Sequence, residues 1–290
     1  MVGVGEILWD VLPHGKQLGG APANFAYHAC QLGNEGVVVS CVGDDDDGNE
    51  IIETLNNKNI THSLVIRDQY PTGTVGVKMD EGGIPSYTIY ENTAWDHLVL
   101  NAAHLELAER ADVICYGTLA LRNRESRESI LKFISHTQPQ CTRIYDINLR
   151  QNYYSKEIIE ILLFTSTILK LNSEELEVVR GMFGLAGNED SLLQQLCRKF
   201  DLALIVLTAG ADGSRLFSLD RGESAMKAVP TEVVDTVGAG DSFTAAVATG
   251  LFRKMSLTEI HSFAAKVSAY VCSRKGATPE LPSVDQLLSI

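Results

Sequence analysis

The sequence predicts an α/β fold, in which a mostly parallel central sheet is covered by helices on both faces and a small β flap lies beside it. Short apolar runs typical of strands alternate along the 290 residues with longer patterns typical of helices. This repeated order favours parallel strands, because a parallel connection needs a crossover that a helix supplies. We find no linker and no internal repeat in the sequence. We therefore expect one domain over 1–290, with a lid contributed mainly by about 63–98.

The expected strands are short runs rich in valine, isoleucine and leucine. In chain order they lie at 2–8, 36–42, 113–116, 143–147, 168–171 and 203–208. The expected helices show a helical spacing of apolar residues. In chain order they lie at 21–32, 49–58, 124–137, 156–165 and 191–200. The first helix also has Pro22 near its start and Gly33 just beyond its end, as helices commonly do.

Two segments break this alternation. Residues 63–98 contain two β-rich runs joined at 81–83 by an Glu-Gly-Gly sequence, which is a hairpin signal and suggests a flap outside the main sheet. Residues 214–229 resemble a second meander of short strands. From Ala239 onward the pattern is helical almost to the end, with a break near Ser256.

Composition restricts the classes of partner. Apolar residues make up 45% of the chain and charged residues 21%, which is typical of a globular protein with a sizeable core. The net charge of −13 argues against nucleic acid or an anionic membrane as a partner, since both are polyanions. A phosphate ligand would therefore need a local site and a divalent cation.

The cysteines and the N-terminus predict a cytoplasmic location. The six cysteines form no CxxC pair and most lie in apolar runs, so we expect free thiols in a reducing compartment. The first ten residues lack the basic region of a signal peptide. We find no apolar run that approaches the ~18 residues of a membrane span.

Three standard phosphate or metal signatures are absent from the sequence. The Gly-Lys pair at 15–16 lacks the other residues of a Walker loop. Gly3 and Gly5 supply two glycines of a dinucleotide fingerprint, but Leu8 stands at the third position. The acidic run at 44–47 leaves the first and twelfth positions of a calcium loop without a carboxylate. We interpret that run as a solvated acidic turn.

The stretch 235–243, DTVGAGDSF, predicts an anion-binding site at the start of a helix. The first N–H groups of a helix have no internal partner, and the helix dipole adds partial positive charge there. Gly238, Ala239 and Gly240 leave those N–H groups open to a phosphoryl group. Asp241 has two open interpretations. It offsets the helix dipole, or it is a base that takes the proton of an attacking hydroxyl.

These nine residues resemble the signature of the ribokinase-like carbohydrate kinases, also called the phosphofructokinase-B family. GEILWDVLPHGKQLGGAPANFA, at 5–26, resembles the sugar-binding signature of that family. DINLRQNYYS at 146–155 and AWD at 94–96 are most similar to bacterial fructokinases. The resemblance spans nearly the whole chain. It implies a ribokinase-like three-layer α/β/α sandwich with a small β lid, and a sugar kinase that uses ATP and Mg²⁺.

The resemblance also implies roles for individual residues. Asp241 matches the catalytic base, and Gly238, Ala239 and Gly240 match the anion hole. The implied substrate-binding residues are Asp10, Gly19, Gly20 and Asn24, to which we add Arg150 because it follows a strand end. The implied nucleotide-binding residues are Asn172, Thr208, Gly210, Gly213, Thr236, Gly238, Gly240, Ala265 and Ser268, and Glu175 is expected to bind magnesium through water.

Structural interpretations of several of these residues stay open. The glycines at 19–20 also suit a plain loop before a helix, and Asn24 suits a first-turn polar residue. Asn172 and Glu175 have the spacing of a helix N-cap with a capping box. Arg150 also suits a surface ion pair.

The implied reaction transfers the γ-phosphoryl of ATP to a primary hydroxyl of a furanose sugar, with D-fructose as the first choice and fructose 6-phosphate as the product. 2-Keto-3-deoxygluconate kinase and ribokinase stay open, the former because an acid substrate would give Arg150 a carboxylate partner. A non-catalytic sugar or nucleotide sensor and a Rossmann oxidoreductase are the alternatives from other classes. The flap at 74–90 would close over the sugar. Relatives often pair such flaps between two chains, which implies a homodimer through the lid.

Overall fold

A nine-stranded sheet forms the centre of the computed structural model, which describes residues 1–12, 15–79 and 85–289. The strand order is β13-β12-β11-β10-β9-β8-β1-β4-β5. The bounds are β1 Val2–Val4, β4 Val37–Gly43, β5 Val65–Asp68, β8 Val113–Gly117, β9 Thr142–Asp146, β10 Ile168–Asn172, β11 Leu204–Thr208, β12 Ser214–Ser218 and β13 Gly222–Met226. Neighbouring strands run parallel from β5 to β11, and the last two strands are antiparallel. The predicted mostly parallel sheet is confirmed.

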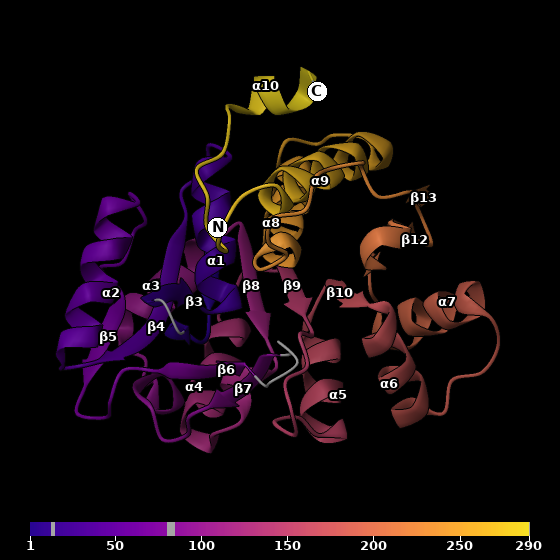
Figure 1. Ribbon diagram of the computed structural model, residues 1–290. Helices are drawn as coiled ribbons and strands as arrows, with labels where there is room; N and C mark the ends of the chain where they lie inside the picture. Colours follow the sequence, from indigo (N-terminus) through magenta and orange to yellow (C-terminus); the bar gives the residue numbers. More distant parts are fainter. Residues whose placement is uncertain (13–14, 80–84, 290) are drawn as a thin grey trace.

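Helices cover both faces of this sheet, which gives three layers (Figure 1). The bounds are α1 Ala21–Gln31, α2 Asp46–Asn57, α3 Ala102–Arg110, α4 Arg124–Ser135, α5 Lys156–Thr165, α6 Ser173–Phe183, α7 Glu189–Phe200, α8 Ala239–Phe252, α9 Leu257–Cys272 and α10 Val284–Ser289. Short 3₁₀ turns lie at Ala94–His97, Leu119–Leu121 and Gly210–Asp212. None of these described helices is both long and apolar enough to cross a bilayer.

The alternation of side chains along each strand separates two apolar cores. In β8, Val113 and Cys115 pack with α1, α8 and α9, whereas Ile114 and Tyr116 pack with the helices of the opposite face. Because both faces of the strand are buried, the sequence of β8 is continuously apolar. The six cysteines are free thiols, as expected.

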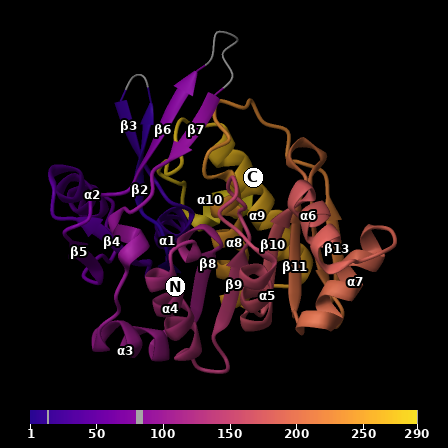
Figure 2. The ribbon, with the colours of Figure 1, turned by 90° about the horizontal axis from the view of Figure 1, so that it is seen from below.

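A separate four-stranded sheet forms the lid and stands off one end of the main sheet (Figure 2). Its order is β3-β2-β6-β7, with bounds β2 Leu8–Leu12, β3 Gly15–Gly19, β6 Thr74–Met79 and β7 Pro85–Ile89. Two of its strands therefore come from the N-terminal segment, outside the expected range of 63–98. In addition, β5 lies inside that range but pairs with β4 in the main sheet. The expected hairpin tip at 81–83 lies outside the described residues.

The prediction of one strand at 2–8 is wrong, because the chain leaves the main sheet after Val4. Gly5 has φ 146°, a conformation that other residues rarely adopt, and the chain turns there before β2 starts at Leu8. The apolar run at 2–8 hides this break, since apolar residues continue on both sides of it. The sugar-binding signature at 5–26 consequently starts at this turn, includes the lid strands β2 and β3, and ends in α1.

Only part of the acidic run at 44–47 is the solvated turn that we expected: Asp44 is 82% exposed, whereas Asp45 has a structural role. Asp45 is the N-cap of α2, and its Oδ1 accepts the N–H of Gly48 over 2.7 Å. Its Oδ2 accepts the N–H of Thr72 over 2.8 Å. Burial raises the pKa of Asp45, but the hydrogen bonds from Thr72 and Gly48 outweigh it and lower the pKa overall. This cap starts α2 at Asp46, three residues before the expected position.

Candidate active site

The N-terminus of α8 has the backbone shape that an anion-binding turn requires. Gly238, its N-cap, has φ 77°, and a Cβ added there would lie 2.3 Å from the carbonyl oxygen of Ala277. Only glycine fits both constraints. The first helical hydrogen bond runs from the N–H of Ser242 to the carbonyl of Gly238. The N–H groups of Gly240 and Asp241 precede it, in the turn where a helix offers no internal acceptor.

The N–H of Ala239 does not share this freedom, which modifies the expected anion hole. It donates to the carbonyl of Thr236 over 3.3 Å and closes the turn before the helix. The carbonyl of Ala239 accepts a hydrogen bond from the hydroxyl of Ser268 over 3.1 Å. The structure therefore places Ser268, a predicted nucleotide-binding residue, beside the turn that it helps to hold.

Asp235, at the start of the signature, fixes the loop before this turn. Its Oδ1 accepts the N–H of Val237 over 3.0 Å, and its Oδ2 accepts the N–H of Gly276 over 2.9 Å. These bonds join the signature to the loop that follows α9. That loop also approaches the lid, since a Cβ on Gly276 would lie 3.5 Å from Oε1 of Gln17 in β3.

Asp241 and Asn24 are 217 positions apart in the sequence and meet directly in the fold. Asn24 Nδ2 donates to Asp241 Oδ2 over 2.8 Å. Burial raises the pKa of Asp241 to about 6, with a further rise from the carboxylate of Asp146. The hydrogen bond from Asn24 and the charges of Lys170 and Arg150 act in the opposite direction. The carboxylate is consequently ionised at neutral pH and has a pKa suited to accepting a proton.

The predicted sugar-binding residues of the lid lie together at the start of α1. Burial raises the pKa of Asp10 to about 6, and the positive charge of Arg150 opposes this. A Cβ on Gly19 would lie 2.4 Å from Asp10 Oδ2, so Gly19 makes room for that carboxylate. Gly20 has φ 106°, and a Cβ there would lie 2.4 Å from the carbonyl oxygen of Glu6. At both positions a larger side chain would collide with a neighbouring group, so packing alone requires glycine there.

Glu6 is a buried carboxylate at this site that the sequence analysis missed. It follows β1, is 3% exposed, and its Oε2 has no hydrogen-bond partner among the described residues. Burial raises its pKa to about 7. The charge of Arg150 lowers the pKa of Glu6, of Asp10 and of Asp241. One exposed arginine thus acts electrostatically on three carboxylates.

Arg150 lies in an unusual backbone segment after β9. Asn148 and Gln151, on either side of it, have φ values of 40° and 48°. Left-handed residues other than glycine cluster at functional sites, because the surrounding structure must hold them in place. Glu175 helps to hold this segment in place, since its Oε1 accepts the N–H of Leu149 over 2.9 Å.

The capping-box interpretation of Asn172 and Glu175 is confirmed. Asn172 accepts the N–H of Glu175 over 2.8 Å, and Glu175 Oε2 accepts the N–H of Asn172 over 2.8 Å. Glu175 is buried, and both of its carboxylate oxygens bind backbone N–H groups. A magnesium role for it stays a prediction.

The remaining predicted nucleotide-binding residues occupy the edge of the main sheet and α9. Thr208 is the last residue of β11. A Cβ added to Gly210 would meet no atom within 4 Å. Gly213 has φ 112° and would collide with the carbonyl of Met226 if it had a Cβ. A cavity of about 330 Å³ lies between 207–215 and 225–227 and includes Gly213. Ala265 packs against the apolar core, and Thr236 is exposed.

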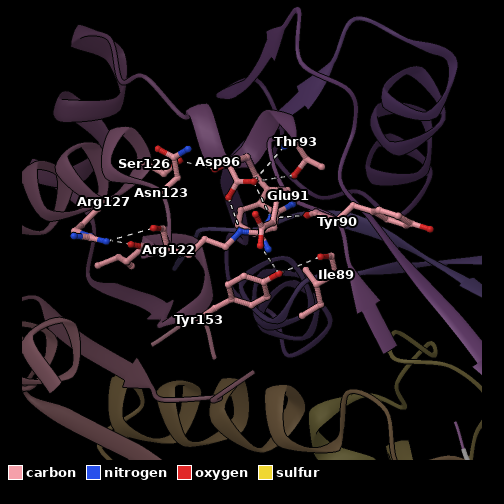
Figure 3. Close-up of polar contacts among 12 residues, drawn as sticks. Ile89, Tyr90, Glu91, Thr93, Asp96, Arg122, Asn123, Ser126, Arg127 and Tyr153 are labelled. Carbon is pink, nitrogen blue, oxygen red and sulfur yellow. Dashed lines mark hydrogen bonds and ion pairs between the residues drawn. The ribbon is translucent and has the colours of Figure 1, made fainter. Parts of the chain in front are cut away.

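A buried ion pair anchors the end of the lid, and it contains the aspartate of the AWD motif (Figure 3). Arg122 Nε and Nη2 donate to the two carboxylate oxygens of Asp96 over 2.7 Å each. Nη2 also donates to the carbonyl of Tyr90, just after β7, over 2.6 Å. The Tyr153 hydroxyl donates to Glu91 Oε1 over 2.8 Å. The chain that leaves the lid is thereby tied to the segment that carries Arg150.

A helix end with open N–H groups beside a carboxylate, at the carboxyl ends of parallel strands, has the geometry that a phosphotransferase acting on small molecules requires. The particular family follows from comparison of the sequence. The chain belongs to the pfkB family of carbohydrate kinases, whose family model matches residues 14–284.

Similar proteins cover nearly the whole chain. Sugar kinase PH1459 of Pyrococcus horikoshii is 28% identical over 286 residues, which cover 97% of this chain and 88% of that protein. Its crystal structure in complex with ATP has a TM-score of 0.85 at 26% identity and covers 99% of this chain and 96% of that one. Fructokinase-1 of Oryza sativa is 28% identical over 318 residues, covering 100% of this chain and 97% of that protein. A fructokinase of Xylella fastidiosa with bound ATP, 21% identical, shares the fold with a TM-score of 0.87, covering 99% of this chain and 96% of that one.

Proposed function

We propose that this carbohydrate kinase is an ATP-dependent fructokinase that converts D-fructose to fructose 6-phosphate. The observation that carries the choice of substrate is the charge of the sugar site. Three carboxylates, Glu6, Asp10 and Asp241, have pKa values that the positive charge of one arginine, Arg150, lowers. A neutral polyol matches such a site, because carboxylates accept hydrogen bonds from hydroxyl groups. The similarity to Fructokinase-1 of Oryza sativa supports the same substrate.

The same charge balance disfavours the acid substrate that Arg150 suggested. A sugar acid such as 2-keto-3-deoxygluconate would bring a fourth carboxylate toward three existing ones. The charge of Arg150 opposes only part of the negative charge of these groups, so an added carboxylate would still meet a net negative site. 2-Keto-3-deoxygluconate kinase and ribokinase accordingly become second choices.

In the proposed reaction, Asn24 positions Asp241, and Asp241 takes the proton of the primary hydroxyl as it attacks. The N–H groups of Gly240 and Asp241 stabilise negative charge on the transferred phosphoryl group. Asp10 and Asn24 orient the sugar. The lid strands cover the site and exclude water, which would otherwise compete for the phosphoryl group. Asn172, Thr208, Gly210 and Gly213 contribute to ATP binding.

The residues present fit a magnesium ion that is bound largely by phosphates and water. No cluster of three acidic, histidine or cysteine side chains able to hold a metal occurs in the described part of the chain. Mg²⁺ typically keeps several waters and binds through one or two carboxylates plus substrate phosphates. Glu175 is the carboxylate that we assign to this role, through water. When bound, Mg²⁺ neutralises charge on the phosphates.

A direct measurement of ADP formation tests the proposal. D-Fructose, D-ribose, 2-keto-3-deoxygluconate and adenosine are compared at saturating ATP and Mg²⁺. We expect kcat/KM to be highest for fructose by at least about tenfold, a difference of about 1.4 kcal/mol in transition-state stabilisation. A higher kcat/KM for any other substrate would contradict the choice of fructose, and ADP formation with none of them would contradict the sugar kinase assignment for these substrates.

An Arg150→Gln variant sharpens the comparison between sugar and acid. If the arginine serves the acid substrate, its loss should raise KM for 2-keto-3-deoxygluconate far more than KM for fructose. We expect instead that the variant turns over fructose with a KM within about threefold of the original, because neutral hydroxyl groups do not need the guanidinium charge.

A further inference from the structure

A buried ion pair lies directly beneath the anion-binding turn and is not part of the reaction proposed above. Asp146 ends β9, and Lys170 stands beside it in β10, in parallel register. Lys170 Nζ donates to Asp146 Oδ1 over 3.0 Å, and the two side chains are 11% and 5% exposed. A buried ion pair is weak evidence for stability, because desolvating two charges offsets most of their attraction. Its position therefore calls for another explanation.

Both members of the pair contact the first turns of α8. The hydroxyl of Thr244, one turn beyond the anion-binding turn, donates to Asp146 Oδ2 over 3.2 Å. The ammonium group packs against Gly240, because a Cβ added to that glycine would lie 2.9 Å from Lys170 Nζ. Gly240 is therefore needed for two reasons. It opens the N–H groups to an anion, and it makes room for the ammonium group on the other side of the backbone.

The two charges act on Asp241 in opposite directions. After burial, the carboxylate of Asp146 is the largest influence that raises the pKa of Asp241, and the ammonium of Lys170 lowers it. Asn24 and Arg150 also face Asp241 and lower its pKa. Burial lowers the pKa of Lys170 itself, but Asp146, Glu175 and Asp241 outweigh this and raise it, so the ammonium stays charged at neutral pH.

We propose that Lys170, held in place by Asp146, is a positioning residue for phosphoryl transfer: it supports the first turn of α8 and keeps Asp241 in the charged state that accepts the sugar proton. It acts through Gly240 and Asp241. This inference rests on the proposed role of Asp241 as the base. Asp146 limits the influence of the ammonium, because its own negative charge opposes it at Asp241.

Two charge-removing variants test the proposal through the pH dependence of kcat/KM for fructose at saturating Mg-ATP. In Lys170→Gln, Asp241 loses a stabilising cation, so the acid side of the profile should move up by about one pH unit, and kcat/KM should fall about twofold at pH 7 and nearly tenfold at pH 5. In Asp146→Asn, Asp241 loses a repelling anion, so the same side should move down. Lys170→Arg keeps the charge and should leave the profile within a few tenths of a unit.

A purely structural role predicts a different pattern. Each change would then lower activity in proportion to lost stability, with the acid side at one pH for all variants. That result, in variants whose thermal unfolding shows them to be folded at the assay temperature, would overturn the proposal. If Lys170→Gln does not fold, the downward shift in Asp146→Asn decides the question, and its absence overturns the proposal.

Further variants identify the carboxylate whose titration shifts the acid side of the profile. Lys170 and Asp146 also act on Glu175, and Glu6, whose pKa is about 7, interacts with Asp241, so the comparison is repeated in a Glu175→Gln background and in a Glu6→Gln background. Opposite shifts that persist there belong to Asp241 and support the proposal, whereas shifts that vanish overturn it. Asp241→Asn with near-normal turnover would overturn the proposed base itself. If Asp241→Asn abolishes turnover and the profiles still coincide, this inference alone fails.

Discussion

Asp241 is the residue on which the proposed chemistry depends, and its neighbours explain why an aspartate can serve as the base. Burial brings its pKa to about 6, and the amide of Asn24 fixes the orientation of its carboxylate. In a loose phosphoryl transfer the attacking hydroxyl needs positioning more than strong activation. A carboxylate that is ionised at pH 7 but close to its pKa meets that need.

The first prediction is that Asp241→Asn lowers kcat by ~10²–10⁴ and leaves the affinity for ATP broadly intact. Asparagine keeps the size of the side chain and can still bind the Asn24 amide, so only proton acceptance is lost. Turnover is measured as ADP formation with fructose, and ATP affinity by calorimetry. Near-normal turnover would remove Asp241 as the base.

The second prediction concerns Glu6 and the pH dependence of stability. Its pKa is about 7 in the folded protein and 4.5 ordinarily, so between these pH values the folded state binds more protons than the unfolded state. The free energy of unfolding should therefore fall as pH rises from 4.5 to 7, by up to about 3 kcal/mol from this group. Below pH 4.5 both states are protonated and the effect disappears.

Glu6→Gln should remove this fall in the free energy of unfolding between pH 4.5 and 7. In urea unfolding, the variant should match the original protein near pH 4.5 and be more stable by about 1–3 kcal/mol at pH 8. Glu53→Gln, at an exposed position of α2, is the control and should show no such pH-dependent gain. An equal difference at both pH values would show that Glu6 does not titrate in this range.

At the scale of the elements, the third prediction concerns the turn that starts α8. Gly238→Ala would place a Cβ 2.3 Å from the carbonyl of Ala277 in a left-handed backbone. We expect a loss of about 1–3 kcal/mol in unfolding free energy and a larger loss of turnover, because the anion-binding N–H groups move. Gly181→Ala, in a helix with open space around it, is the control and should be neutral or stabilising by about 0.5–1 kcal/mol. Equal effects of the two changes would contradict this account.

The fourth prediction compares two anchors of the lid. Arg122→Met leaves Asp96, 2% exposed, as a buried unpaired charge, so we expect a loss of about 3–5 kcal/mol. Lys16, on β3, pairs with Asp47 and Glu50 of α2, but these three side chains are 29%, 43% and 50% exposed. Lys16→Met should cost less than about 1 kcal/mol. Chemical unfolding of both variants checks the difference, and a larger loss for Lys16→Met would contradict it.

The order of elements was predictable because strand and helix patterns are local. The run ILKLN gives β10, and the proline and glycine around 21–32 give α1. The lid was predicted only in part, since residues of β2 pair with residues of β6 that lie 65 positions further along the chain, and no local pattern records such a pairing. Most expected boundaries are correct to within a few residues, and α2 is displaced by its Asp45 cap.

The site was predictable where a signature names its residues and not where burial decides. Asp241 and Asn24 were identified from signatures, but their hydrogen bond joins positions that only the fold brings together. Lys170 and Asp146 were overlooked, although a signal exists. A charged residue within an apolar strand of a parallel sheet is almost never buried unless it is paired. In ILKLN the lysine is the central residue, and TRIYD ends with the aspartate.

At the scale of the whole molecule, the lid is a second sheet that pairs with no strand of the main sheet among the described residues. The four strands form a sheet of their own, in which β3 and β7 are the edges among the described residues. Unpaired strand edges tend to associate with another chain. Val11, in β2, is 43% exposed, and it points away from the neighbouring Asp10 because side chains alternate along a strand.

The last prediction is a homodimer through the lid. In light scattering after size exclusion, the mass should be twice that of the chain at micromolar concentration. Val11→Asp places a charge in the proposed interface and should yield monomers. If the lid covers the sugar and ATP binds at the main sheet, as we propose, these monomers should show a raised KM for fructose and a nearly unchanged KM for ATP. Leu288→Asp, at an exposed apolar position of α10, is the matched control and should leave the mass and both constants unchanged. A monomeric original protein with full activity would show that the lid closes without a partner.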